Sequence, residues 1–277
     1  MTINCKGKLI DFSSPKVMGV LNTTPDSFYD GGYYKNEKEL LNQTEKMLLE
    51  GATFIDIGAY SSKPGASHIS EEEELQRILP VVAAIIKEFP ETIISIDTFR
   101  SSIAKETVAI GAALINDISG GTLDEKMFET VAKLQVPYIL MHMKGTPQNM
   151  QKNPTYGNIT TELISFFAEQ IFKLHQLHLK DVVIDVGFGF GKTLEHNYQL
   201  LKDLSLFKNL DVPVLAGISR KSMLYKPLDI SAKEALNATT AANTIALLNG
   251  ANILRVHDVK EAVEAINIVN LLNQAKN

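Results

Sequence analysis

The sequence predicts a single (β/α)8 barrel domain, a TIM barrel, that spans residues 1–277. The first reason is that short runs of valine, isoleucine, leucine and phenylalanine alternate with longer stretches of helical period, which is typical of repeated strand–helix units and a parallel sheet. The second is that eight such units fit the usual size of a barrel, about 250 residues. A doubly wound sheet is the alternative, but the glycine-rich turn that usually follows its first strand is missing here.

The predicted elements follow one another in strand–helix order along the chain. The strands are residues 17–21, 54–57, 93–96, 114–118, 138–141, 182–186, 214–216 and 253–256. The helices include residues 37–50, 71–88, 159–177 and 232–248, and residues 259–272 follow the last strand. Ser70 and Glu73 have the spacing of a capping box, so the second of these helices is expected to begin directly after Ser70.

Composition excludes several classes of protein. With 45% hydrophobic and 21% charged residues in 277, the chain is long enough to bury a full core. The net charge of -5 argues against a nucleic-acid partner. One cysteine, Cys5, excludes an internal disulfide framework and suits a reducing compartment. Because no apolar segment reaches the roughly 18 residues of a membrane span and no signal-peptide pattern is seen, we expect a cytoplasmic protein without a membrane partner.

Polar residues stand at the end of nearly every predicted strand. Barrel enzymes carry their function at the C-terminal strand ends, so these side chains are expected to share one rim. Side chains alternate along a strand, and this sends Arg255 and His257 to the same side, into the mouth of the barrel. The rim residues are Asn22, Asp56, Asp97, Asn116, His142, Asp185, Lys221, Arg255 and His257.

The rim has two chemical poles. Arg255, His257 and Asn22 form a site for an anion such as phosphate, because arginine binds phosphate bidentately and an asparagine oxygen can hold a hard metal ion beside it. The other pole, which offers acceptors and donors suited to the edge of a nitrogen-rich aromatic ring, consists of Asp97, Asn116, Asp185 and Lys221.

The stretch VVIDVGFGFGK, residues 182–192, is a buried strand that ends in Asp185 and a glycine-rich loop. It is not a phosphate-binding P-loop, because Val186 stands where the first glycine should be. It is not a dinucleotide fingerprint either, because Gly191 follows Gly189 by two residues instead of three. Two further loops, residues 23–32 and 59–66, are polar and rich in glycine and proline, and we expect them to act as lids or turns.

Residues 18–32, MGVLNTTPDSFYDGG, closely resemble the N-terminal signature of the dihydropteroate synthases, and the resemblance covers essentially the whole chain. It continues through GATFIDIGAYSSKPGA, ISIDTFR, INDISGG, VVIDVGFGFGK, GISRKS and RVHDV. This resemblance implies a barrel enzyme that condenses 6-hydroxymethyl-7,8-dihydropterin diphosphate with p-aminobenzoate and releases diphosphate. It also implies Mg2+ as cofactor and a homodimer.

The resemblance assigns roles to individual residues of this chain. The catalytic residues that it implies are Asp97, Lys221, Asp30 and Lys63. Pterin contacts fall on Asp97, Asn116, Asp185, Lys221, Met141, Gly217 and Asp56. Diphosphate contacts fall on Asn22, Arg255, His257 and Ser62, with Asn22 also as the magnesium ligand. The residues expected to contact p-aminobenzoate are Phe28, Pro64, Phe190, Lys221 and Ser222.

The second loop departs from the family pattern. Where the family usually has Gly-Glu-Ser-Thr-Arg-Pro-Gly, this chain has AYSSKPG at residues 59–65, so Tyr60 replaces a glutamate and Lys63 an arginine. Lysine keeps the charge but loses the planar fork of arginine. One alternative, which this loop supports, is a pterin-binding relative that has lost catalysis. Another is a pterin-dependent corrinoid methyltransferase, which shares the barrel and a similar pterin edge, although the first-loop signature and the Arg255 and His257 pair favour the synthase.

Overall fold

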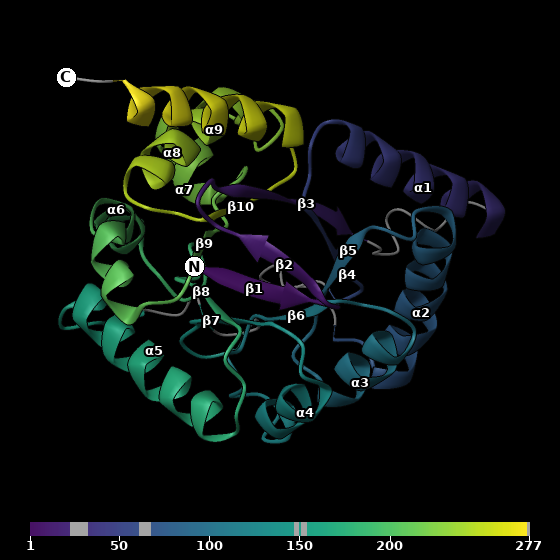
Figure 1. Cartoon of the computed structure of the whole chain (residues 1–277). Helices are drawn as coiled ribbons and strands as arrows, with labels where there is room; N and C mark the ends of the chain where they lie inside the picture. The colour runs from purple at the N-terminus through teal and green to yellow at the C-terminus, as the bar shows by residue number, and fades with distance from the viewer. Residues whose placement is uncertain (23–32, 61–67, 147–149, 151–153, 276–277) are drawn as a thin grey trace.

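The eight predicted strands form one closed parallel barrel in the computed structural model, which describes residues 1–22, 33–60, 68–146, 150 and 154–275 (Figure 1). Their order around the barrel is that of the chain, and β10 closes the ring by pairing with β3. No strand end differs from its predicted position by more than one residue. The strands are β3 (Lys16–Asn22), β4 (Phe54–Gly58), β5 (Ile93–Asp97), β6 (Leu114–Asp117), β7 (Tyr138–Met141), β8 (Val182–Asp185), β9 (Val214–Ala216) and β10 (Ile253–Val256).

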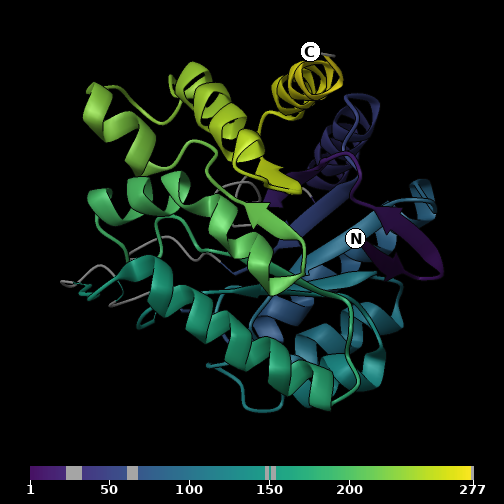
Figure 2. The same ribbon diagram turned by 60° about the vertical axis from the view of Figure 1, so that its left-hand side comes forward.

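Helices surround the barrel on the outside (Figures 1 and 2). They are α1 (Tyr33–Leu49), α2 (Glu71–Glu88), α3 (Ser101–Ala109), α4 (Met127–Leu134), α5 (Ile159–Gln176), α6 (Leu194–Lys202), α7 (Ser222–Tyr225), α8 (Leu236–Leu248) and α9 (Val259–Gln274), with short 3-10 helices η2 (Leu204–Leu210) and η3 (Lys226–Leu228). The Ser70 side chain accepts a hydrogen bond from the backbone N–H of Glu73, as the sequence predicts for the start of α2. Within the described part of the chain, no helix has the length and apolarity that a membrane crossing requires.

The start of α8 differs from the prediction. Residues 232–235 form a turn instead of the first helical turn, and α8 begins at Leu236. The backbone oxygens of Ala232 and Lys233 accept hydrogen bonds from the guanidinium of Arg220. Those carbonyls are therefore bound by a distant side chain, an interaction that helical periodicity in the sequence cannot reveal.

The barrel interior is layered, with apolar side chains below and polar side chains above. Phe54 in β4, Val183 in β8 and Ile253 in β10 belong to one buried apolar cluster inside the barrel. Two residues further along each strand, on the same face, the side chain is polar, as in Asp185 and Arg255. The alternation thus places a polar layer at the C-terminal ends of the strands, directly above an apolar floor.

A hairpin of β1 (Thr2–Cys5) and β2 (Lys8–Asp11) covers the other end of the barrel. Its side chains Ile3, Cys5 and Ile10 belong to the same apolar cluster as the lower layer of the barrel. Figure 1 shows the hairpin across the middle of the ring, and Figure 2 shows it at one end of the barrel. This hairpin was not predicted from the sequence. Because it covers the apolar end of the barrel, the opposite, polar end is the candidate site.

Candidate active site

Asp56 is the centre of a buried hydrogen-bond network in the polar layer. One carboxylate oxygen accepts from the Ser95 hydroxyl at 2.6 Å, and the other accepts from the Asn116 amide at 2.9 Å and from Arg255 at 3.4 Å. The strands β4, β5, β6 and β10 are thereby joined across the barrel. Both oxygens of Asp56 are thus engaged by protein donors, so its charge acts on the site mainly by fixing Asn116 and Arg255.

Two buried acceptors at the mouth have no hydrogen-bond partner among the described residues: Asp185 Oδ2 and Asn116 Oδ1. The other oxygen of Asp185 accepts from the Gly187 N–H at 2.8 Å, and Oδ2 lies 3.9 Å from an Arg255 nitrogen. A buried polar atom without a partner costs free energy, so such atoms indicate a ligand with matching donors. Gly217 borders this site, because a Cβ there would lie 3.3 Å from Arg255 Nε and 3.5 Å from Asp185 Oδ2.

Asp97 ends β5 beside this network, and it is only half-buried. Burial and the charge of Asp56 raise the pKa of its carboxyl from 3.8 to about 8, although Arg255 opposes the shift. Burial alone would lower the pKa of Arg255. The negative charges of Asp56, Asp185 and Asp97 outweigh this effect, so the pKa of Arg255 is raised. The mouth therefore concentrates three carboxyl groups around one arginine, a typical sign of a functional site.

Lys221 lies next to the aromatic ring of Phe190. The Lys221 ammonium donates to the Phe188 carbonyl and lies 4.7 Å from the centre of the Phe190 ring. Burial lowers the pKa of Lys221 to about 7, and Arg255 adds to this effect against the nearby carboxylates. Phe190 also packs in an apolar cluster with Met141. These residues form an aromatic and cationic wall next to the unpaired acceptors.

The anionic pole lies at the junction of β3 and β10. These strands pair with Val256 opposite Gly19, so the end of β3 at Asn22 and the Arg255–His257 segment belong to the same part of the rim, where both Asn22 and His257 are exposed. The Ser219 hydroxyl bonds the His257 ring at 3.0 Å and accepts from its backbone N–H. The rim thus offers an amide oxygen, an imidazole and a guanidinium to one ligand.

Not every predicted site residue lies in this mouth. The ring of His142 turns toward Lys192 and packs edge-on against Phe166, so it faces away from the other rim side chains. Ser222 is the first residue of α7 and is half-buried. The predicted loop residues Phe28, Asp30, Ser62, Lys63 and Pro64 lie outside the described part of the chain.

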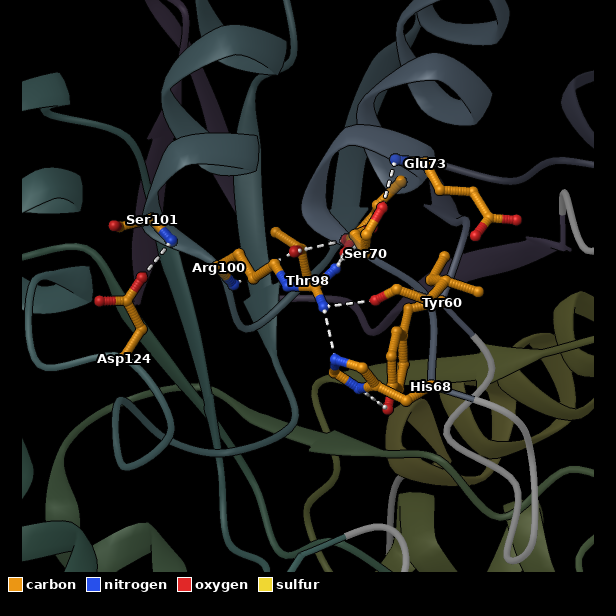
Figure 3. A network of polar contacts seen from close by, with 10 residues as sticks. Tyr60, His68, Ser70, Glu73, Thr98, Arg100, Ser101 and Asp124 are labelled. Carbon is orange, nitrogen blue, oxygen red and sulfur yellow. Dashed lines mark hydrogen bonds and ion pairs between the residues drawn. The ribbon is translucent and has the colours of Figure 1, made fainter.

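A separate network connects β5 to the start of α2 (Figure 3). Arg100 forms an ion pair with the fully buried Glu74 and donates to the Ile69 carbonyl at 2.7 Å. Tyr60, which replaces the family's usual glutamate, hydrogen-bonds the His68 ring at 3.2 Å. The Tyr60 hydroxyl thus contacts His68, and the other ring nitrogen of His68 lies 3.4 Å from the Arg100 guanidinium that pairs with Glu74.

Two polar residues near the mouth, Ser95 and Lys192, were not predicted from the sequence. Ser95 precedes Asp97 by two residues, so strand alternation alone could have placed it on the same inward face. Lys192 is buried behind the glycine-rich loop, with only 4% of its surface exposed. Its position at the end of that loop was visible in the sequence, but its burial was not.

Comparison with known proteins gives concordant results. The family profile described as pterin binding enzyme matches residues 18–257. A dihydropteroate synthase of Escherichia coli is 43% identical over 100% of this chain and 98% of its own length. The Yersinia pestis dihydropteroate synthase, solved with a sulfonamide drug, is 42% identical with a TM-score of 0.93 and covers 99% of this chain and 100% of its own. A Xanthomonas albilineans dihydropteroate synthase in complex with 7,8-dihydropteroate is 33% identical, with a TM-score of 0.89 over 100% of both chains.

Proposed function

The chain belongs to the dihydropteroate synthases of the pterin-binding enzyme family, and from this premise we propose how its barrel mouth carries out their reaction. The activity is the synthesis of 7,8-dihydropteroate in the folate pathway. It joins 6-hydroxymethyl-7,8-dihydropterin diphosphate to p-aminobenzoate and releases diphosphate. The observation that carries the placement of the substrates is the pair of buried, unpaired acceptors on Asp185 and Asn116.

The pterin ring is bound edge-on by the polar layer. Its amide and amino N–H groups donate to Asp185 Oδ2 and Asn116 Oδ1, which gives those oxygens the partners that the protein does not provide. A sugar or an acyl chain would not supply such a row of donors. Contacts to the ring are completed by Asp97, Lys221, Met141 and Gly217, with Asp56 holding the network behind them.

The diphosphate lies at the rim between β3 and β10. Arg255 and His257 bind its oxygens, and Ser62 is assigned there by resemblance. The resemblance assigns the metal to the oxygen of Asn22, which is exposed at the end of β3. That donor set fits Mg2+, which keeps several waters and binds substrate phosphates through few protein ligands. When bound, magnesium neutralises charge on the leaving diphosphate.

p-Aminobenzoate binds outside the pterin, against the Phe190 ring and the Lys221 ammonium. These two groups lie 4.7 Å apart and can hold a benzoate ring and its carboxylate, respectively. Ser222 lies next to Lys221 at the start of α7. The remaining contacts, Phe28 and Pro64, and the catalytic roles of Asp30 and Lys63 are assigned by resemblance.

In the mechanism that we propose, the C–O bond breaks before the amine attacks. The bonding electrons leave with the diphosphate, which Arg255 and His257 hold, and the dihydropterin delocalises the positive charge left at its exocyclic methylene. Asp97, whose pKa is about 8 in the free enzyme, loses its proton to water as this cation develops beside it, and the carboxylate stabilises the charge. The neutral aromatic amine then forms the C–N bond and loses its proton to water. Substrate labelled with oxygen-18 in the bridging position should therefore scramble its label without p-aminobenzoate, and Asp97→Asn should slow the scrambling.

The proposed function is tested by a turnover assay with both substrates and magnesium, in which dihydropteroate and diphosphate are measured together. Equal amounts of the two products are expected, and none without p-aminobenzoate. Binding of pterin without any turnover would support the non-catalytic relative instead. Methyl transfer from a methylated pterin to a corrinoid, in the absence of dihydropteroate synthesis, would support the methyltransferase.

We further propose that the enzyme is a homodimer through α8 and α9. Large apolar side chains on the outer faces of these helices are 45–64% exposed: Ile245, Leu248, Ile268, Leu271 and Leu272. An exposed apolar surface of this kind is typical of an interface. Light scattering should give twice the mass of 30.5 kDa, and Ile268→Glu with Leu271→Glu should give the monomer. One domain over residues 1–277 and a cytoplasmic location stay predictions.

A further inference from the structure

Lys192 is a buried lysine that the proposed reaction does not use. It ends the glycine-rich stretch between β8 and α6, and only 4% of its surface is exposed. Its Nζ lies 2.9 Å from the Phe190 carbonyl oxygen, 3.1 Å from the His142 carbonyl oxygen and 3.2 Å from His142 Nδ1. Burial lowers the pKa of Lys192 to about 7, and in its ammonium form the group has three donors, one for each of these acceptors. Lys192 therefore binds the loop that carries Phe190 to the end of β7.

The loop depends on such side-chain contacts, because its backbone is unusual. Gly187, Gly189 and Gly191 have φ values of 68°, 82° and 61°, in the left-handed region that glycine tolerates. A backbone hydrogen bond from Phe190 N–H to the Gly187 oxygen closes one tight turn. Lys221 binds the Phe188 carbonyl, but Lys192 binds the carbonyl of Phe190 itself. Lys192 therefore fixes the peptide unit that sets the direction of the Phe190 ring.

The contact with β7 is close and leaves little room for a different arrangement. A Cβ on Gly187 would lie 2.1 Å from the His142 carbonyl oxygen and 3.2 Å from Lys192 Nζ. The His142 ring is itself packed edge-on against Phe166, with ring centres 5.0 Å apart. Burial and the Lys192 charge lower the pKa of His142 to about 3, so the ring is neutral, and in the tautomer with its proton on Nε2 the Nδ1 atom accepts from the lysine. The lysine thus has a rigid partner on the barrel.

We propose that Lys192 is a positioning residue for p-aminobenzoate, because it holds the Phe190 ring in place against the benzoate site. This inference rests on the proposed placement of p-aminobenzoate on Phe190. Lys192 itself does not need to touch either substrate in this role. Loss of the ammonium should therefore weaken p-aminobenzoate binding selectively, because Lys192 hydrogen-bonds His142 and Phe190 and not the pterin acceptors Asp185 Oδ2 and Asn116 Oδ1.

The test compares Lys192→Met, Lys192→Gln and Phe190→Leu in steady-state kinetics with each substrate varied. We expect Lys192→Met to raise the KM for p-aminobenzoate by at least about fivefold, because two buried carbonyls and a ring nitrogen lose their donor. The KM for the pterin diphosphate should change by less than about twofold, since its acceptors are untouched. Lys192→Gln keeps part of the donor and should lie between Lys192→Met and wild type. Lys202→Met, at an exposed lysine that ends α6, controls for the lost charge.

The outcomes separate this inference from the proposed function. If Phe190→Leu raises the KM for p-aminobenzoate but neither Lys192 variant does, the positioning role is overturned. Equal increases for both substrates would also overturn it, because they indicate general damage to the site. If Phe190→Leu has no effect, the placement of p-aminobenzoate is wrong, and faster amide exchange across residues 187–191 in Lys192→Gln would still show the anchoring. If Lys192→Met fails to fold, Lys192→Gln decides.

Discussion

Replacing Asp185 by asparagine removes the acceptor that the structure offers most clearly to the pterin. In the wild type, Oδ1 accepts from Gly187 N–H at 2.8 Å and Oδ2 has no hydrogen-bond partner among the described residues. Asparagine would have one oxygen and one NH2 group at the positions of Oδ1 and Oδ2. Whichever way the amide turns, one N–H faces another donor, either the Gly187 N–H or the pterin edge.

The magnitude follows from the burial of this group, which is 0% exposed. A buried donor or acceptor left without a partner costs about 1–3 kcal/mol, so pterin affinity should fall by about ten- to a hundredfold. Isothermal titration calorimetry with the pterin substrate measures this directly, and Asp229→Asn at an exposed aspartate serves as the matched control. Unchanged affinity in Asp185→Asn would refute the placement of the pterin edge.

Three further predictions concern the metal, the binding order and Asp97. Excess EDTA should stop turnover and magnesium should restore it, because Asn22 alone cannot neutralise a diphosphate; full activity in EDTA would exclude the metal role. p-Aminobenzoate should bind more tightly after the pterin and diphosphate, since Phe190 packs beside Met141, which lines the pterin; equal affinity for the empty enzyme would contradict this. The pKa of Asp97 is raised to about 8, so its contribution to stability is present near pH 4 and is lost as the pH rises to about 8. Asp97→Asn should therefore raise the free energy of unfolding by about 1–2 kcal/mol at pH 9, discounted for partial exposure, and less at pH 5.5; no gain at pH 9 in urea unfolding would count against a raised pKa.

The strands and the polar layer were predictable because both follow from local pattern. A short β-branched run that ends in a polar residue specifies a strand and its inward face, and for this reason Asp185 and Arg255 were placed correctly at the mouth. Strand alternation also places Ser95 on the inward face that bears Asp97, and there its hydroxyl donates to Asp56.

Other features depend on contacts between distant residues, which one sequence does not reveal. His142 ends β7 like the other rim residues, but Lys192, 50 positions later, binds it and keeps its ring away from the mouth. The β1–β2 hairpin was missed because the predicted barrel strands are nearly continuous apolar runs, whereas β1 alternates buried and exposed residues and β2 buries only Ile10. The buried position of Lys192 was missed for the same reason as the role of His142.

The most direct test of the central claim is a crystal structure of this enzyme with a bound pterin. The account predicts that the ring lies in the barrel mouth, with its N–H groups about 2.7–3.2 Å from Asp185 Oδ2 and Asn116 Oδ1. A pterin bound elsewhere, or one that leaves both oxygens without a donor, would contradict the claim.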